Sequence, residues 1–316
     1  MILGQAHTRA DVKNLLLFAA LLKHGVTMPL QQLVPLQQLV DYFNDRFEHE
    51  HHSNFRPFIL EKGLVSGIFG PIRVSSTFLP VRQADNSEAL IGHIAQISVI
   101  PYDNSVHSEQ SAEMGNLITD VATQPTNFQS IISLDRLCRT VHMLNYLNHA
   151  HNGGVVFLDV DPRHILGVQQ EHGAYFEKII FKCGLATKNV VISTAINNSY
   201  ALNHTQLLDG LYNYRRRGYQ IALNIGSLYT ATGLWDLIVK MSANYLRINA
   251  PNIETNQHSD AVWPSDLKKL IELQNLAGGQ TILQQIEQKE QANIAAPAGF
   301  DLVQGDYYEK LVTEIA

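Results

Sequence analysis

Cysteine is nearly absent from this sequence. The two that occur, Cys138 and Cys183, lie far apart, and neither has a neighbouring motif that would make it a nucleophile. Such usage argues against a disulfide framework and is typical of a protein from a reducing compartment. We therefore expect both residues to be buried structural thiols.

Long apolar runs and an excess of positive charge are missing too. No stretch of about 18 apolar residues occurs, so the sequence predicts no membrane span. Residues 15–22 are apolar, but Lys13 and Lys23 bound them and no small-residue cleavage site follows, unlike a signal peptide. The formal net charge is -6, and the dense basic run at residues 215–217 is typical of a solvated helix end. This balance argues against a nucleic-acid binder.

The composition that is present is globular, with 45% apolar and 16% charged residues. Residues 1–50 predict an N-terminal helical segment, in which Leu15, Leu16, Ala19 and Leu22 share one face. Because an apolar stripe of this kind needs a partner surface, we expect the segment to pack on the main domain or to form a homodimer. The main domain is then residues 51–316.

The most polar patch is Glu48-His49-Glu50-His51-His52. Imidazoles and carboxylates this close are able to bind Zn²⁺ or Cu²⁺. Adjacent residues rarely converge on one metal, however, and the sequence indicates no fourth ligand. We favour a solvated helix end, and we expect no metal and no cofactor.

Strand and helix patterns alternate through the rest of the chain. A hairpin is predicted at residues 55–59 and 64–74, a strand at 95–100, and a long surface excursion over about 75–130. Beyond it we predict a helix at 131–147, strands at 155–160, 179–181 and 190–193, and a helix at 202–216.

The most informative stretch is residues 218–249. A buried strand, an amphipathic helix and a second strand follow one another, which indicates a parallel crossover unit. Repetition of such units predicts an α/β fold, a closed barrel rather than an open sheet. Function in such folds sits at the carboxyl ends of the strands. An enzyme would be expected to carry carboxylates or a lysine there, yet this chain carries Asn224, Ile225, Arg247 and Asn249.

Several short motifs in order carry a family resemblance. The first three are Phe55-Arg56-Pro57-Phe58 for Tyr-Gln-Pro-Ile, Gly67-Ile68-Phe69-Gly70-Pro71-Ile72-Arg73 for Gly-Val-Glu-Ala-Leu-x-Arg, and Leu158-Asp159-Val160-Asp161-Pro162-Arg163 for Val-Asn-Leu-Ser-Pro-Arg. The next two are Ile221-Ala222-Leu223-Asn224-Ile225-Gly226 for Ile-Ala-Leu-Asp-Asp-Phe-Gly and Asn244-Tyr245-Leu246-Arg247-Ile248-Asn249 for Asp-Tyr-Leu-Lys-Ile-Asp. The last two are Gln284-Gln285-Ile286-Glu287-Gln288-Lys289-Glu290-Gln291 for Glu-Gly-Val-Glu-Thr-Glu-Glu-Gln and Asp301-Leu302-Val303-Gln304-Gly305 for Asp-Tyr-Val-Gln-Gly. From about residue 55 to 308 the chain resembles the EAL domains, which hydrolyse cyclic di-GMP on a modified (β/α)8 barrel.

The resemblance implies a two-metal site that this sequence has mostly lost. EAL domains hold two divalent cations with carboxylates and an Asn, and the metals activate a water for attack on a phosphodiester. The corresponding positions here are Phe69, Asp159, Thr194, Asn224, Ile225, Arg247 and Gln284, with Asp159 the one carboxylate among them. Hard cations need oxygen ligands, preferably charged ones. We therefore predict no catalytic residues and no phosphodiesterase activity.

Three functions remain in competition. The favoured one is a catalytically inactive regulatory domain that binds a protein partner in bacterial cyclic di-GMP-type signalling, which the resemblance implies is cytoplasmic. The alternative is a receptor that binds cyclic di-GMP without hydrolysing it, through a vestigial site at Arg73, Asp159, Arg247 and Gln304. An unrelated enzyme is disfavoured, because the strand ends show no nucleophile–base set. We also expect Phe69 and Ile225 to form an apolar plug in the barrel mouth.

Overall fold

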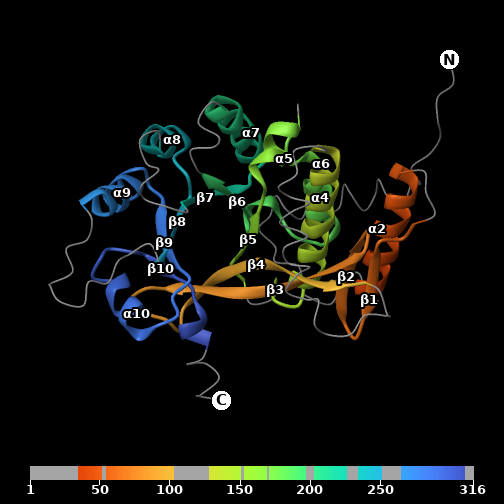
Figure 1. The fold of residues 1–316 in the computed structure, drawn as a ribbon, viewed down its shortest axis with the longest axis horizontal. Coiled ribbons are helices and arrows are strands. Elements are labelled where there is room, and N and C mark those ends of the chain that lie inside the picture. Colours follow the sequence, from red (N-terminus) through yellow and green to blue (C-terminus); the bar gives the residue numbers. More distant parts are fainter. Residues whose placement is uncertain are drawn as a thin grey trace, which may run out of the picture. The chain divides into compact units, whose positions relative to one another are not determined.

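A closed barrel forms the centre of the computed structural model, which describes residues 35–51, 55–102, 128–150, 153–168, 171–196, 203–225, 234–250 and 265–309 (Figure 1). The strands are β1 (Phe58–Glu61), β2 (Leu64–Phe69), β3 (Ile72–Gln83), β4 (Leu90–Pro101), β5 (Val155–Asp159), β6 (Val190–Ile196), β7 (Gln220–Ile225), β8 (Tyr245–Asn249), β9 (Gln280–Gln284) and β10 (Leu302–Val303). The helices are α2 (Leu36–His51), α4 (Phe128–Tyr146), α5 (Pro162–Gly167), α6 (Ala174–Lys182), α7 (His204–Arg216), α8 (Leu234–Met241), α9 (Ser265–Leu276) and α10 (Lys289–Ala295), with a 3-10 turn η3 (Thr187–Asn189).

The barrel closes because β3 pairs at both of its edges. The sheet order runs β1-β2-β3-β10-β9-β8-β7-β6-β5-β4, and β4 returns to pair with β3. From β4 to β10 every neighbouring pair is parallel, whereas β3 is antiparallel to both β4 and β10. This confirms the predicted closed α/β barrel, with one reversed strand as its modification. Figure 1 shows the helices along the outside of these strands.

Each barrel strand separates two apolar layers. Its inward positions fill an inner core, made of Val81, Ile94, Phe157, Val191, Ala222, Tyr245, Ile282 and Leu302. Its outward positions pack against the helices, as Ile221, Leu223 and Ile225 of β7 do. Because side chains alternate along a strand, the parity of a residue decides which layer it joins.

Two sequence-based expectations about elements are wrong. Residues 75–130 were expected to form a surface excursion, but residues 72–101 form β3 and β4, the pair that closes the barrel; residues 103–127 lie outside the described part. These strands carry serine, threonine and exposed positions, so they lack the apolar run of a fully buried strand. Residues 179–181, expected as a strand, belong to α6. A short apolar run does not distinguish a buried helix from a strand.

The N-terminal expectations are tested only in part. Residues 35–51 are described, and α2 occupies most of them, as predicted. The leucine-rich face at Leu15, Leu16, Ala19 and Leu22 lies outside the described residues. None of the helices in the described part of the chain is both long and apolar enough to cross a bilayer.

Two buried asparagines hold the β1–β2 hairpin between helices. Asn145 of α4 accepts from the backbone N–H of Val65 at 2.8 Å and donates to its carbonyl at 2.7 Å. Asn44 of α2 makes the same pair of bonds with Phe58, at 2.9 and 2.8 Å. Each side chain therefore satisfies both polar groups of one strand residue that water does not reach.

Asn145→Ala should lower the free energy of unfolding by about 2–3 kcal/mol, because it leaves the buried N–H of Val65 without a partner and its carbonyl with only the long bond from the Ser75 hydroxyl, at 3.4 Å. Chemical denaturation measures the change. Gln37→Ala is the matched control, since its amide bonds Asp41 on the exposed side of α2 and should cost less than about 0.5 kcal/mol. Equal effects of the two variants would contradict the assigned role.

Three buried histidines make stability depend on pH. Burial lowers the pKa of His93 and of His142 to about 4. Burial together with the Arg139 charge lowers the pKa of His164 to about 2. Each is neutral in the folded chain but takes up a proton near pH 6.5 when unfolded, so its contribution to stability is present above that pH and is lost as the pH falls. Asp135 acts in the opposite sense, since burial raises its pKa to about 6.

We expect the free energy of unfolding to fall between pH 6.5 and about 4, and His93→Phe to reduce that slope by about one proton, roughly 1.4 kcal/mol per pH unit. Denaturation at a series of pH values measures the slope. His49→Gln, on the exposed face of α2, is the control for removing a histidine without changing the core. An unaltered slope in His93→Phe would show that His93 is already charged in the folded chain.

Candidate functional site

Polar side chains line the carboxyl ends of the barrel strands. They lie two residues beyond members of the inner core, or four in the case of Asn249, and therefore face the same side of the sheet. We call the following set the mouth residues: Asp159 after Phe157, Ser193 after Val191, Asn224 after Ala222, Arg247 and Asn249 after Tyr245, Gln284 after Ile282 and Gln304 after Leu302. The change from apolar to polar marks the end of the inner core and the start of the mouth.

Arg247 is the centre of the mouth. Its Nε donates to Oε1 of Gln284 at 2.7 Å, and one terminal nitrogen donates to Oδ1 of Asp159 and to Oγ of Ser193, both at 2.5 Å. The amide nitrogen of Gln284 in turn donates to Oδ1 of Asn224 at 3.1 Å and to Oδ1 of Asn249. One connected network thus joins β5, β6, β7, β8 and β9.

The ion pair in this network is asymmetric. Arg247 is only 4% exposed, whereas the Asp159 side chain is 55% exposed. The buried guanidinium has lost its hydration and needs its protein partners to compensate, whereas the carboxylate remains partly hydrated. Charge-assisted bonds of this length are the strong class of hydrogen bond. The positive charge of the mouth is therefore fixed in place and the negative charge faces solvent.

The structure brings most of the predicted site residues together. Asp159, Asn224, Arg247 and Gln284 all belong to the network. Gln304 is buried at its edge, where its Oε1 accepts from the backbone N–H of Gln285 at 3.3 Å. Sequence reasoning missed Ser193 and did not include Asn249 in the site. The parity of their strands would have revealed both, because each lies two residues from another inward-facing position.

Phe69 and Arg73 are not in the mouth, contrary to expectation. Phe69 ends β2, which lies outside the closed barrel. Arg73 pairs with Glu61 at 2.7 Å and with Ser66 Oγ at 2.7 Å, at the start of β3. Their motif spans β2 and the start of β3, whereas the antiparallel pair that closes the barrel is β3 and β4.

The strand pair that closes the barrel also resembles the opening motifs. On β3, Phe78-Leu79-Pro80-Val81 is similar to Tyr-Gln-Pro-Ile, and on β4, Gly92-His93-Ile94-Ala95-Gln96 is similar to Gly-Val-Glu-Ala-Leu. In that comparison Ile94 lies at the place of the Glu. Its side chain is buried in the inner core, opposite Phe157 of β5. An alkyl group at this position offers a cation no ligand.

Thr194 and Ile225 are also misplaced by the sequence match. Both face the helix layer, where Ile225 joins the outer core and the Thr194 hydroxyl donates to the carbonyl of Val160 at 3.1 Å. A side chain one residue out of register lies on the opposite face of its strand. The expected apolar plug of Phe69 and Ile225 is therefore wrong, and a polar network stands in the mouth instead.

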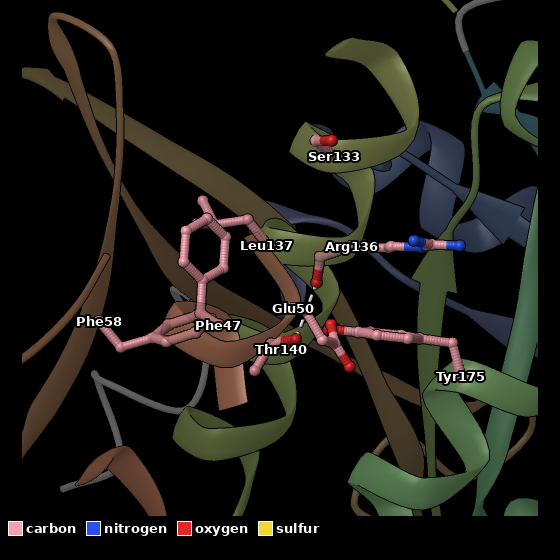
Figure 2. A pocket seen from close by; sticks show the side chains of 8 residues that line it. All are labelled: Phe47, Glu50, Phe58, Ser133, Arg136, Leu137, Thr140 and Tyr175. Carbon is pink, nitrogen blue, oxygen red and sulfur yellow. Dashed lines mark hydrogen bonds between the residues drawn. The ribbon is translucent and has the colours of Figure 1, made fainter. Parts of the chain in front are cut away.

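A pocket lies away from the mouth, between α2, β1, α4 and α6 (Figure 2). Figure 2 shows Tyr175 reaching toward Glu50, and Thr140 donating to the carbonyl of Arg136. The Tyr175 ring lies between two guanidinium groups, 4.1 Å from that of Arg46 and 4.6 Å from that of Arg136. None of the mouth residues lines this pocket. Its contacts fasten α2 to α4 and α6.

Comparison with known proteins gives structural matches. No family model and no curated protein matches the sequence. Solved structures do match: the Bacillus subtilis YkuI protein with an EAL domain, in complex with c-di-GMP and calcium, at a TM-score of 0.56, 20% identity and 74% of this chain. The c-di-GMP-bound standalone EAL protein of Vibrio cholerae O395 gives 0.54 and 14%, over 74% of this chain and 90% of that one. The cAMP-bound EAL enzyme Bd1971 gives 0.57 and 15%, over 96% and 73%.

The chain has an EAL-type barrel fold. At these identities the likeness establishes the fold and leaves the chemistry to the residues themselves. The chain spans 54% of the YkuI structure, so the activity of that whole protein does not transfer with the fold.

Asp159→Asn should destabilise the chain by about 2–3 kcal/mol, because the buried Arg247 guanidinium loses its carboxylate partner. Glu61→Gln is the matched control: it breaks an arginine–carboxylate contact of similar length, and its acid is exposed to a similar extent as Asp159, but its partner Arg73 is 22% exposed, unlike the buried Arg247. That change should cost less than about 1 kcal/mol. Urea unfolding of both variants measures the difference, and a smaller effect for Asp159→Asn than for Glu61→Gln would contradict the network.

Proposed function

We propose that this EAL-type barrel does not hydrolyse cyclic di-GMP and serves as a regulatory domain that binds a protein partner in cyclic di-GMP-type signalling. One observation carries the proposal: the guanidinium of Arg247 occupies the centre of the mouth and is bonded there to Asp159, the one carboxylate among the mouth residues. The rest of the set consists of four amides and a hydroxyl.

The mouth residues do not fit a pair of divalent cations. Two-metal hydrolysis needs several charged oxygen ligands around metals a few ångströms apart. Here the single carboxylate already neutralises Arg247, and a cation placed beside it would meet that positive charge. The amides of Asn224 and Gln284 are further committed to each other. Arg247 is also unable to accept a proton, because its guanidinium stays protonated.

The alternative is a receptor that binds cyclic di-GMP without hydrolysing it. The donor character of the mouth favours it: a guanidinium and four side-chain amides suit phosphodiester oxygens. Two of the solved EAL-type structures, YkuI and the Vibrio cholerae protein, hold c-di-GMP. Against it stands the engagement of Arg247, whose bonds to Asp159 and Ser193 would have to be exchanged for the ligand.

Purified protein incubated with cyclic di-GMP and Mg²⁺ or Mn²⁺ should give no linear dinucleotide above the no-enzyme control, and calorimetric titration should give no saturable heat. Chromatography of the nucleotide measures the first and the titration the second. EDTA should leave the melting temperature unchanged, because the mouth residues do not suit a divalent cation.

Asp159→Ala is the control for a contaminating enzyme. Turnover that disappears in this variant would overturn the proposal, whereas turnover that persists comes from another protein. Saturable heat without turnover, lost in Arg247→Ala, would place the receptor function first.

A further inference from the structure

Among the described residues, strand β4 has an unpaired edge beyond its last β5 partner. It pairs with β3 along its whole length, from Leu90 to Pro101, but with β5 only from Gly92 to Ala95. Residues 96–101 therefore continue past the last β5 partner with one side of the strand unpaired, within the part of the chain that the structure describes. Strand edges of this kind are ready templates for another strand.

The backbone groups that point outward on this edge can be identified. The N–H of Tyr102 donates to the carbonyl of Pro71 at 2.9 Å, and Pro101 lies opposite Ile72. Hydrogen-bonded and non-bonded pairs alternate in an antiparallel ladder, so the even-numbered residues of this stretch bond to β3. The N–H and carbonyl groups of Ile97 and Val99 consequently face away from β3.

The side chains of this stretch include few of those that usually protect an edge strand. Residues 94–102 contain no charged side chain. Ile97 is 46% exposed and Ile100 is 51% exposed. Natural edges are commonly blocked by lysine, by an inward charge or by a bulge. In this stretch the one residue that can block pairing is Pro101, at the end of the strand.

We propose that this edge pairs with the same edge of a second copy of the chain, as an antiparallel two-fold ladder centred on Ser98. The bounds of the unpaired stretch determine the centre of the ladder. At one end, β5 pairs with this edge as far as Ala95, and at the other end the strand stops at Pro101. In a two-fold ladder centred on Ser98, Ala95 of one copy lies opposite Pro101 of the other. Each β4 strand therefore ends at the point where the edge of the other copy's β4 is already occupied by its own β5.

The residues that meet across this ladder are compatible with one another. Ile97 lies opposite the partner's Val99 and forms a hydrogen-bonded pair with it, which gives four backbone bonds over the two symmetric pairs. Ser98 lies opposite the partner's Ser98, where small side chains avoid a clash. Because no charge lies in the stretch, the two-fold axis brings no like charges together. A two-fold contact of one patch with itself is the commonest way in which oligomers close.

This dimer does not depend on the absence of hydrolysis. It is also distinct from a dimer through residues 1–50. The contact involves a short strand from each copy, and small interfaces of this size are weak. We therefore expect a concentration-dependent dimer with a dissociation constant in the micromolar range.

The test is sedimentation equilibrium of the full chain, from low to several hundred micromolar, on wild type, Ile97→Lys and Val239→Lys. Wild type should shift from the mass of one 35.4 kDa chain toward twice that mass. Ile97→Lys should weaken the dimer by at least about tenfold, or 1.4 kcal/mol, because it sets like charges close together across the two-fold axis. Val239 of α8 is similarly exposed, at 52%, so Val239→Lys should dimerise as wild type does.

Amide hydrogen exchange locates the contact. The amides of Ile97 and Val99 should gain protection as concentration rises, while those of Ser98 and Ile100, which donate to β3, should stay protected throughout. Ile97→Pro, which removes one outward N–H and leaves the bonds to β3 intact, should also weaken the dimer. A wild type that remains a monomer, or a dimer that Ile97→Lys and Ile97→Pro leave unchanged, would overturn the proposal.

Discussion

The mouth of this barrel is arranged around one buried guanidinium, which needs hydrogen-bond partners. Arg247 stands on β8 where water does not reach it, so its donors must be met by the neighbouring strands. Asp159, Ser193 and Gln284 meet them, and Gln284 extends the network to two asparagines. A carboxylate-rich mouth would repel itself without cations. In this chain Arg247 neutralises Asp159, and hydrogen bonds between side chains connect the mouth without a metal cation.

The pleat of the strands determines which residues take part. Residues of one parity fill the inner core and then, at the carboxyl ends, the mouth, while their neighbours pack beneath the helices. The same alternation separates the two sides of the β4 backbone past Ala95, where one side bonds to β3 and the other is free. The mouth depends on side chains that alternate between the two faces of the sheet. The free edge depends on backbone groups that alternate between the two sides of the strand.

The sequence predicts the barrel because repeated strand–helix units have few other ways to bury their strands. It predicts Asp159, Asn224, Arg247 and Gln284 because their motifs sit at strand ends. It fails at Phe69 and Arg73, where a hairpin outside the barrel imitates the antiparallel pair that opens it. It fails at Thr194 and Ile225 because a match one residue out of register moves a side chain to the other face. Short motifs identify a strand more securely than they identify its inward positions.

The most direct test of the central claim is a crystal structure grown with Mn²⁺ and cyclic di-GMP, with anomalous scattering measured for manganese. The account predicts that Arg247 remains bonded to Asp159, Ser193 and Gln284, and that the mouth shows no anomalous peak. One or two manganese peaks at Asp159, with the Arg247 side chain displaced from it, would contradict the account.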